Sequence, residues 1–397
     1  MSRTDQAVSA WRFIFIFGAV SLLADFVYEG ARSITGPLLA SLGASGLVVG
    51  VVTGVGEAAA LGLRLVSGPL ADRTQRFWAW TIAGYALTVV SVPALGLTGA
   101  LWVACALVIA ERVGKAVRSP AKDTLLSHAT SVTGRGRGFA VHEALDQVGA
   151  VLGPLTVAGV LAVTGNDYAP ALGVLALPGV AALALLVWLR WRVPQPRSYE
   201  TSPAVENPVM GGRWSLPTQF WMYCGFVAIT MTGFATFGLL SFHMVTHRLL
   251  TPAAVPVIYA ATMAAGALAA LASGWGYDRF GAKTLAALPI LSALVAVLGF
   301  TGDVAMVVVG ALLWGAAVGI QESTLRGVVA DLVAPPRRAS AYVIFAAGLG
   351  TATALGGALI GWLYDVSTST LVSVVVGIQL FALAAMIVLR LPCSSAR

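Results

Sequence analysis

Charged residues are scarce in this chain. Asp, Glu, Lys and Arg together make up 10% of its 397 residues, whereas hydrophobic residues make up 58%. Soluble domains carry about a quarter charged residues, so the composition excludes an ordinary soluble protein. Apolar segments of about 20 residues cross a bilayer as helices, and lipid excludes open sheets and exposed loops. We therefore predict an all-α polytopic membrane protein that contacts the lipid bilayer.

Cysteine is also scarce, and the motifs of several enzyme classes are missing. The three cysteines, Cys105, Cys224 and Cys393, allow no even pairing, and two of them lie in predicted helices, so we expect no disulfide. The sequence shows no metal-ligand cluster, nucleophile elbow or phosphate-binding loop, so we expect no enzyme activity, no metal and no cofactor. No cleavable signal peptide is evident, because the first apolar run is long and contains acidic residues.

The apolar runs predict twelve membrane spans. They cover residues 11–42, 46–71, 77–97, 100–128, 137–163, 168–192, 217–247, 252–276, 283–300, 304–332, 337–363 and 369–391. A polar segment rich in Pro, Ser and Glu, residues 194–216, divides the spans into two sets of six and is typical of a flexible cytoplasmic linker. The predicted domains are an N-terminal bundle (1–193), this linker and a C-terminal bundle (217–397).

The basic residues indicate how the spans are oriented. Alternating the loops puts 17 of the 24 Lys and Arg residues on one side of the membrane, only Arg248 on the other, and six within the spans. Cytoplasmic loops are the ones enriched in Lys and Arg. We therefore predict a multi-pass protein of the cell membrane with both termini in the cytoplasm. The same asymmetry accounts for the net charge of +7 without nucleic acid as a partner.

The two halves of the chain repeat one another. Each half ends its second span with the pattern Gly-x-x-x-Asp-Arg. The residues are Gly68, Asp72 and Arg73, followed by Arg76, in the first half, and Gly274, Asp278 and Arg279 in the second. Parallel six-helix repeats imply two bundles related by an axis along the membrane normal, with a site between them.

On these residues the chain resembles the major facilitator superfamily over essentially its whole length, and in particular its drug:proton antiporter-like exporters. The repeated pattern is similar to the superfamily's loop signature, and Gly149, Gly153 and Pro154 in the fifth span are similar to its antiporter motif. The resemblance implies 12 transmembrane helices in two pseudo-symmetric six-helix bundles. It also links Arg112, which resembles an arginine of the superfamily's fourth helix, to proton coupling.

Charged residues inside the spans form a second pattern. Arg112, Lys115 and Arg118 are three residues apart and Lys122 follows four later, so all four lie along one side of a helix. A charge at mid-membrane costs about 2.5–3.5 kcal/mol, so this row needs acidic partners or a water-filled cavity. Seven acids and six bases fall within the spans. We therefore expect one intramembrane carboxyl to carry a proton, as proton coupling requires.

The positions of these residues suggest three groups. The predicted proton-coupling residues are Asp25, Glu29, Glu57 and Arg112. The predicted substrate-cavity residues are Tyr28, Arg32, Lys115, Phe234, Phe237, Glu322 and Arg326. The predicted gate residues are Arg64, Gly68, Asp72, Arg73, Arg76, Arg118, Asp123, Glu143, Asp146, Gly149, Gly153, Pro154, Asp278 and Arg279. The alternative is that the charges form structural salt bridges that only hold the bundle together.

The function indicated by this pattern is secondary active transport by a monomer. The leading hypothesis is proton-coupled export, by alternating access, of small amphiphilic or cationic compounds, favoured by the antiporter-like motif and by the acidic residues of the first span. The aromatic residues of the seventh and eighth spans suit amphiphilic or aromatic substrates. An importer of an anionic metabolite is the alternative favoured by the row from Arg112 to Arg118, and a lipid or lysolipid translocator is a third. Asp72 is expected to act as a latch that meets a helix N-terminus of the other bundle when the cytoplasmic side is shut.

Overall fold

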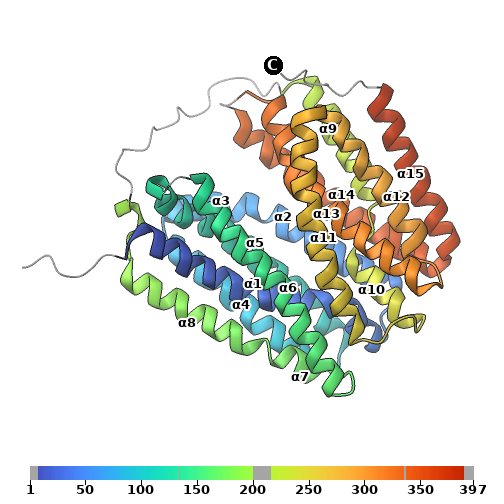
Figure 1. Cartoon of the computed structure of the whole chain (residues 1–397), viewed down its shortest axis with the longest axis horizontal. Helices are drawn as coiled ribbons and strands as arrows, with labels where there is room; N and C mark the ends of the chain where they lie inside the picture. The colour runs from blue at the N-terminus through green and yellow to red at the C-terminus, as the bar shows by residue number, and fades with distance from the viewer. Residues whose placement is uncertain (1–7, 134, 200–215, 335–336, 389–397) are drawn as a thin grey trace, which may run out of the picture.

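The computed structural model describes residues 8–133, 135–199, 216–334 and 337–388 (Figure 1). The side chain of Arg326, Cys393 and most of the predicted linker lie outside this description. The described elements are α1 (Ala10–Ser41), α2 (Gly46–Gly62), α3 (Arg64–Thr74), α4 (Phe77–Leu97), α5 (Leu101–Thr133), α6 (Arg135–Val163), α7 (Tyr168–Gly173), α8 (Ala176–Arg192), η1 (Pro196–Tyr199), α9 (Thr218–Thr232), α10 (Phe237–Thr246), α11 (Ala254–Phe280), η2 (Gly281–Ala286), α12 (Ala287–Gly299), α13 (Val304–Leu332), α14 (Arg338–Val366) and α15 (Thr368–Val388).

These elements form the twelve predicted spans. Four spans consist of two consecutive elements: α2 with α3, α7 with α8, α9 with α10, and η2 with α12. Ten spans are long and apolar enough to cross a membrane by composition alone. The other two are α5, which carries the row of charges, and the short span ending in α12. The predicted all-α fold of 12 helices in two bundles is confirmed, and Figure 1 shows the two bundles as separate groups of helices.

The break between α9 and α10 is the fold's main departure from continuous spans. Residues 233–236 leave the helix, and the side chain of Thr236 caps the start of α10. The indole nitrogen of Trp314 donates a hydrogen bond of 2.9 Å to the carbonyl oxygen of Ala235, and Ser292 donates one of 3.0 Å to that of Gly233. Backbone groups left unpaired at membrane depth would cost several kcal/mol, so these bonds stabilise the break.

Glycines allow close packing within the N-terminal bundle. Gly149 and Gly153 of α6 lie directly against the backbone of α1, at Leu22 and Phe26, where any side chain would collide with that backbone. Small residues four apart let two membrane helices approach in this way. The residues that resemble the antiporter motif therefore hold α6 against α1, the helix that carries Asp25 and Glu29.

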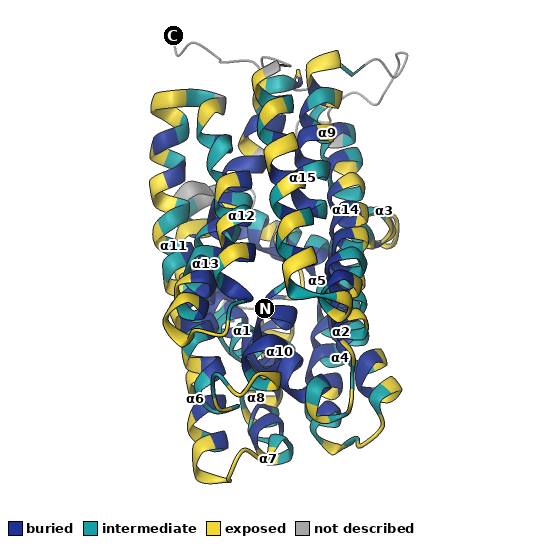
Figure 2. Cartoon of the chain, turned by 90° about the vertical axis from the view of Figure 1, so that its right-hand side faces the viewer, coloured by how far each residue is buried: buried dark blue, intermediate teal, exposed yellow. Residues whose placement is uncertain are grey.

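The two bundles meet at one end of the molecule. We call this end the loop side, because it holds the short connections α1–α2 and α4–α5 and the start of α13. Here α2 packs along α14, and a Cβ on Gly54 would lie 2.9 Å from the carbonyl oxygen of Thr353. The side chains of α10 from Phe237 to Met244 are all buried at this junction (Figure 2). Toward the opposite side, where α1 begins and η1 lies, the bundles diverge (Figure 1). We call this the linker side.

A carboxylate reinforces the loop-side junction. Asp365, near the end of α14, accepts hydrogen bonds from the backbone N–H groups of Gly46 (2.7 Å) and Leu47 (2.8 Å), the first residues of α2. The first N–H groups of a helix have no partner within the helix, and the helix dipole is positive at that end. Asp365 thus binds an N-terminal-bundle helix from the C-terminal bundle.

We predict that Asp365→Asn loosens this junction. A charge at a helix N-terminus is worth about 0.3–2 kcal/mol, which corresponds to a change of about two- to thirtyfold in the ratio of open to closed molecules. The measurement is disulfide cross-linking of two cysteines that replace Asn166 and Ala253, in a background with the native cysteines replaced by serine. These positions lie close together across the junction, because the backbone N–H of Ala253 donates a hydrogen bond of 3.1 Å to the Asn166 side chain in the native protein. The cross-linking yield should fall.

The matched control for this prediction is Asp303→Asn. Asp303 also caps a helix N-terminus on the loop side, at 2.9 Å from the N–H of Met306, but it lies within one bundle. Its substitution should leave the cross-linking yield unchanged. If the yield of Asp365→Asn also equals that of the native sequence, the carboxylate has no role in holding the loop side shut.

Candidate functional site

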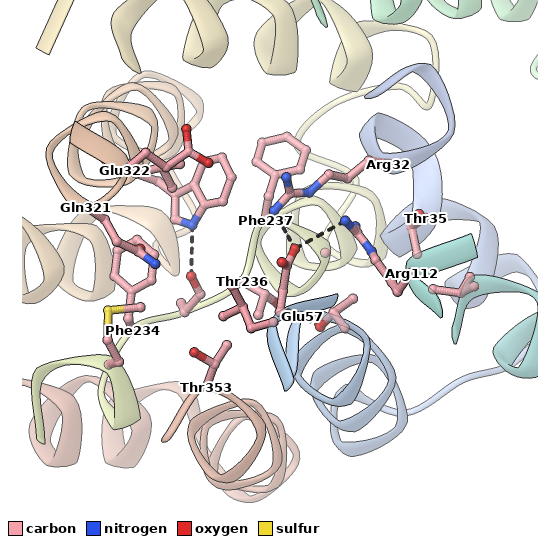
Figure 3. Close-up of a pocket in the computed structure, with 18 of the residues that line it drawn as sticks. Arg32, Thr35, Glu57, Arg112, Phe234, Thr236, Phe237, Gln321, Glu322 and Thr353 are labelled. Atoms are coloured by element: carbon pink, nitrogen blue, oxygen red, sulfur yellow. Dashed lines mark hydrogen bonds and ion pairs between the residues drawn. The ribbon is translucent and has the colours of Figure 1, made fainter. Parts of the chain in front are cut away.

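A cavity lies between the two bundles, with about 830 Å³ of space not filled by protein atoms when open solvent is included (Figure 3). Its walls come from α1, α2 and α5 of the N-terminal bundle and from α9, α10, α13, α14 and the break before α10 in the C-terminal bundle. The cavity is therefore bounded by helices that the two halves of the sequence supply separately. Such cavities between pseudo-symmetric repeats are where transporters of this architecture bind substrate.

The N-terminal wall of the cavity is built around Glu57. One oxygen of this carboxylate accepts a hydrogen bond of 2.7 Å from Arg32 and lies 3.4 Å from a guanidinium nitrogen of Arg112 (Figure 3). Arg112 also lies 3.4 Å from Glu111 and donates a hydrogen bond to the hydroxyl of Tyr28. One carboxylate thus pairs with two arginines from different helices, and all three charged groups line the cavity between the bundles.

The facing wall is aromatic. Phe234 lies within the break between α9 and α10, and Phe237 is the first residue of α10 (Figure 3). Trp314 of α13 stacks on Phe234, with the ring centroids 6.4 Å apart, and lies 5.3 Å from the ring of Phe237. Aromatic faces such as these bind apolar and cationic groups. Gln321 and Glu322 add polar atoms to the same wall.

Lys115 lies on the N-terminal wall with Tyr28 behind it. Its ammonium group sits 4.1 Å from the centroid of the Tyr28 ring, and within the described part of the chain no carboxylate lies within 4.0 Å of it. Tyr28 itself is buried and does not line the cavity, which corrects its prediction as a cavity residue. Its ring and hydroxyl instead support Lys115 and Arg112 from behind.

Deeper on the linker side, the α5 row continues inside the N-terminal bundle. Arg118 lies 3.9 Å from Asp25, and Lys122 lies 3.7 Å from Asp146. His142 lies 3.5 Å from the same Asp146. The cations of α5 therefore face acids of α1 and α6, as buried charges require. None of these five residues lines the cavity between the bundles.

Glu29 lies behind the cavity wall as well. Its carboxylate is buried, lies 3.7 Å from Arg32, and accepts a hydrogen bond from the hydroxyl of Tyr259 on α11. Tyr259, Trp314 and Asp365 were not predicted from the sequence, because no charge spacing or motif marks the two aromatic residues and Asp365 stands alone at a helix end. The available signal was the position of Asp365 in the C-terminal half, where charged residues are rare.

The remaining predicted gate residues lie mainly on the surface of the linker side. The exposed gate residues are Asp72, Arg73, Arg76, Asp123, Glu143, Asp278 and Arg279. Glu143 was expected within the buried gate network, but α6 turns it outward, where it accepts a hydrogen bond of 3.2 Å from Gln147. Arg64 is half-buried at the start of α3, and Gly68 lies near Pro120. Because the bundles diverge on this side, the described residues show no latch between Asp72 and the C-terminal bundle.

Two helical bundles around a charged and aromatic cavity are an architecture typical of membrane transport proteins. The sequence profile of the Major Facilitator Superfamily matches residues 17–302 and 222–396. The chain belongs to the major facilitator superfamily, as the motifs predicted.

The chain is similar to proteins from other organisms and to solved structures. The protein Rv2265 of Mycobacterium tuberculosis is 77% identical over 390 residues, which cover 98% of this chain and 95% of that protein. The multidrug resistance protein MdtH of Photorhabdus laumondii subsp. laumondii is 27% identical over 379 residues, covering 92% and 89% of the two chains. The crystal structure of the nucleoside transporter NupG shares the fold, with a TM-score of 0.74 at 13% identity over 95% of this chain and 99% of that chain.

The structure predicts which acid pairs with Arg112. Arg112→Ala should lower the free energy of unfolding by about 3–5 kcal/mol, because buried carboxylates lose their counter-charge. A second change, Glu57→Gln, should recover part of that loss. Asp25→Asn should not, since Asp25 faces Arg118. Thermal unfolding in detergent measures the stability of the single variant and of the two double variants. Equal recovery by both second changes would show that the arrangement around Glu57 is not specific.

Proposed function

We propose that the protein exports small amphiphilic compounds across the cell membrane in exchange for protons. The observation that carries the proposal is the pairing of two unlike walls in one cavity. Glu57 is shared between Arg32 and Arg112 on one wall, and Phe234, Phe237 and Trp314 form the other. The aromatic wall suits the apolar body of an amphiphile, and the charged wall suits its polar group.

The shared carboxylate offers a route from substrate binding to proton exchange. A polar or cationic group of the substrate competes with Arg32 and Arg112 for Glu57. The displaced guanidinium of Arg32 is also within 3.7 Å of Glu29. An arginine that approaches or leaves a buried carboxylate changes how readily that carboxylate holds a proton. Substrate binding at Glu57 therefore alters proton binding at the acids behind it.

Three observations support the direction of transport. The predicted excess of Lys and Arg on the linker side, where the two bundles diverge (Figure 1), favours a cytoplasmic position for that side. The glycines that resemble the antiporter motif lie against α1, beside the acids proposed to carry protons. The relative MdtH is named for multidrug resistance.

One observation favours a second candidate function, the import of an anionic metabolite. Lys115 lines the cavity, and its ammonium group contacts the ring of Tyr28 with no carboxylate within 4.0 Å among the described residues. Such a cation is suited to bind a carboxylate or phosphate. The two candidates differ in the charge of the transported compound and in the direction of the accompanying proton.

A flux assay in proteoliposomes distinguishes them. The purified protein is given an imposed pH gradient and a panel of amphiphilic cations, neutral amphiphiles and small anions, while substrate movement and internal pH are followed together. Antiport predicts that amphiphile movement toward the more acidic side accompanies proton movement in the opposite direction. Movement of anions together with protons would establish the second candidate. Absence of gradient-driven movement for the whole panel would contradict proton coupling.

Asp25 provides the next prediction. Asp25→Asn should abolish transport driven by a pH gradient, because one of the acids proposed to carry protons is removed, yet it should retain exchange of labelled for unlabelled substrate. Both modes are measured in the same proteoliposomes. Asp167→Asn serves as the control, since Asp167 is a helix cap on the loop side, 2.9 Å from the N–H of Ala169, and should transport normally. Uphill transport by Asp25→Asn would exclude Asp25 from the mechanism.

A further inference from the structure

A buried hydrogen bond joins the proposed proton-carrying helix to the opposite bundle. The hydroxyl of Tyr259 on α11 donates to the Glu29 carboxylate on α1. The Tyr259 side chain is fully buried and that of Glu29 nearly so. The bond lies where the bundles are in contact, so α1 and α11 cannot separate on the loop side unless it breaks.

The strength of this bond depends on the charge of Glu29. A hydrogen bond to a carboxylate is about twice as strong as one between neutral groups. The charged carboxylate is also held in place by Arg32 on its own helix, at 3.7 Å. The other charged groups that act on it are Asp25 on α1 and Lys115 and Glu111 on α5. When Glu29 takes up a proton, the ion pair with Arg32 and the charge-assisted part of the bond are both lost.

The ring of Tyr259 packs against the aromatic wall of the cavity. Its edge meets Phe237, with centroids 4.6 Å apart, and its centroid lies 6.4 Å from that of Trp314. Phe237 and Trp314 line the cavity, whereas Tyr259 lies behind them. A compound that displaces either ring would therefore also disturb the packing of Tyr259, whose hydroxyl is bonded to Glu29.

We propose that Tyr259 is a positioning residue that holds the empty carrier closed on the loop side until substrate occupies the aromatic wall. This inference rests on the proposed proton antiport. With Glu29 charged and the cavity empty, the bond is at full strength and the bundles stay together. Substrate against Phe237 and Trp314 releases it from one side, and a proton on Glu29 weakens it from the other.

The arrangement prevents a proton leak. If the empty carrier with charged Glu29 could open on the loop side, Glu29 would bind a proton there, and the carrier would return and release that proton on the linker side. One proton would then cross per cycle with no substrate moved. An antiporter must exclude this cycle, whereas a symporter needs the empty carrier to reorient. The Tyr259–Glu29 bond is thus a device suited to antiport.

The test is Tyr259→Phe, which keeps the ring and removes the hydroxyl. In proteoliposomes without substrate, internal pH should change about tenfold faster than for the native protein under the same gradient, because a bond to a charged group is lost. Cross-linking of cysteines at Asn166 and Ala253 should fall in parallel. Tyr223→Phe is the matched control: its buried hydroxyl donates to the carbonyl oxygen of Leu325 within one bundle, at 2.9 Å, and neither readout should change.

A double-mutant cycle separates positioning from general stability. Glu29→Gln imitates the protonated acid and should itself lower the cross-linking yield, and adding Tyr259→Phe should then change the yield less than it does in the native background. The cross-linking measurement uses no substrate. A fall in cross-linking yield that depends on Glu29 therefore supports the Tyr259–Glu29 bond by itself. If the native protein shows no proton exchange, that result contradicts the proposed function and leaves the bond supported. Native coupling with an unchanged leak rate and unchanged cross-linking in Tyr259→Phe would overturn the inference.

Discussion

Hydrocarbon offers no partner for a charge, and this constraint organises the N-terminal bundle. Helix α5 presents Arg112, Arg118 and Lys122 along its length, and each lies within 4.0 Å of an acid supplied by another helix. Glu57 of α2, Asp25 of α1 and Asp146 of α6 are those acids. Since removing one partner of a buried pair is costly, the row on α5 specifies how three neighbouring helices are placed around it.

The contact between the bundles has a different character. Glycine packing of α2 on α14 gives close van der Waals contact, and a few polar bonds supplement it: Asp365 to the start of α2, Tyr259 to Glu29, and the hydroxyls of Thr53 and Thr236, which lie 2.9 Å apart. Such contacts are each worth only about one to a few kcal/mol. A junction of this kind holds one conformation while leaving another within reach, as alternating access requires.

The cavity connects these two regions because residues of both regions line it. Its charged wall consists of α1, α2 and α5 residues that form ion pairs with one another, so a compound bound there would lie against these ion pairs. Its aromatic wall depends on the break between α9 and α10, where the backbone is stabilised by Trp314, itself a wall residue. Binding on either wall therefore acts on a structural element that also supports the junction between the bundles, through Arg32 on one side and through Phe237 and Tyr259 on the other.

The sequence by itself determined the membrane class, the twelve spans and the superfamily, because apolar length, repeated Gly-x-x-x-Asp-Arg turns and the Lys/Arg asymmetry are local properties of the chain. Helical spacing also placed the α5 charges on one face. Only the tertiary structure decided that Arg112 pairs with Glu57, that Tyr28 lies behind the wall, that Glu143 faces outward and that Tyr259 reaches Glu29. The physical reason is that periodicity specifies which residues share a face of a helix, whereas the partner of that face is chosen by the packing of helices far apart in the sequence.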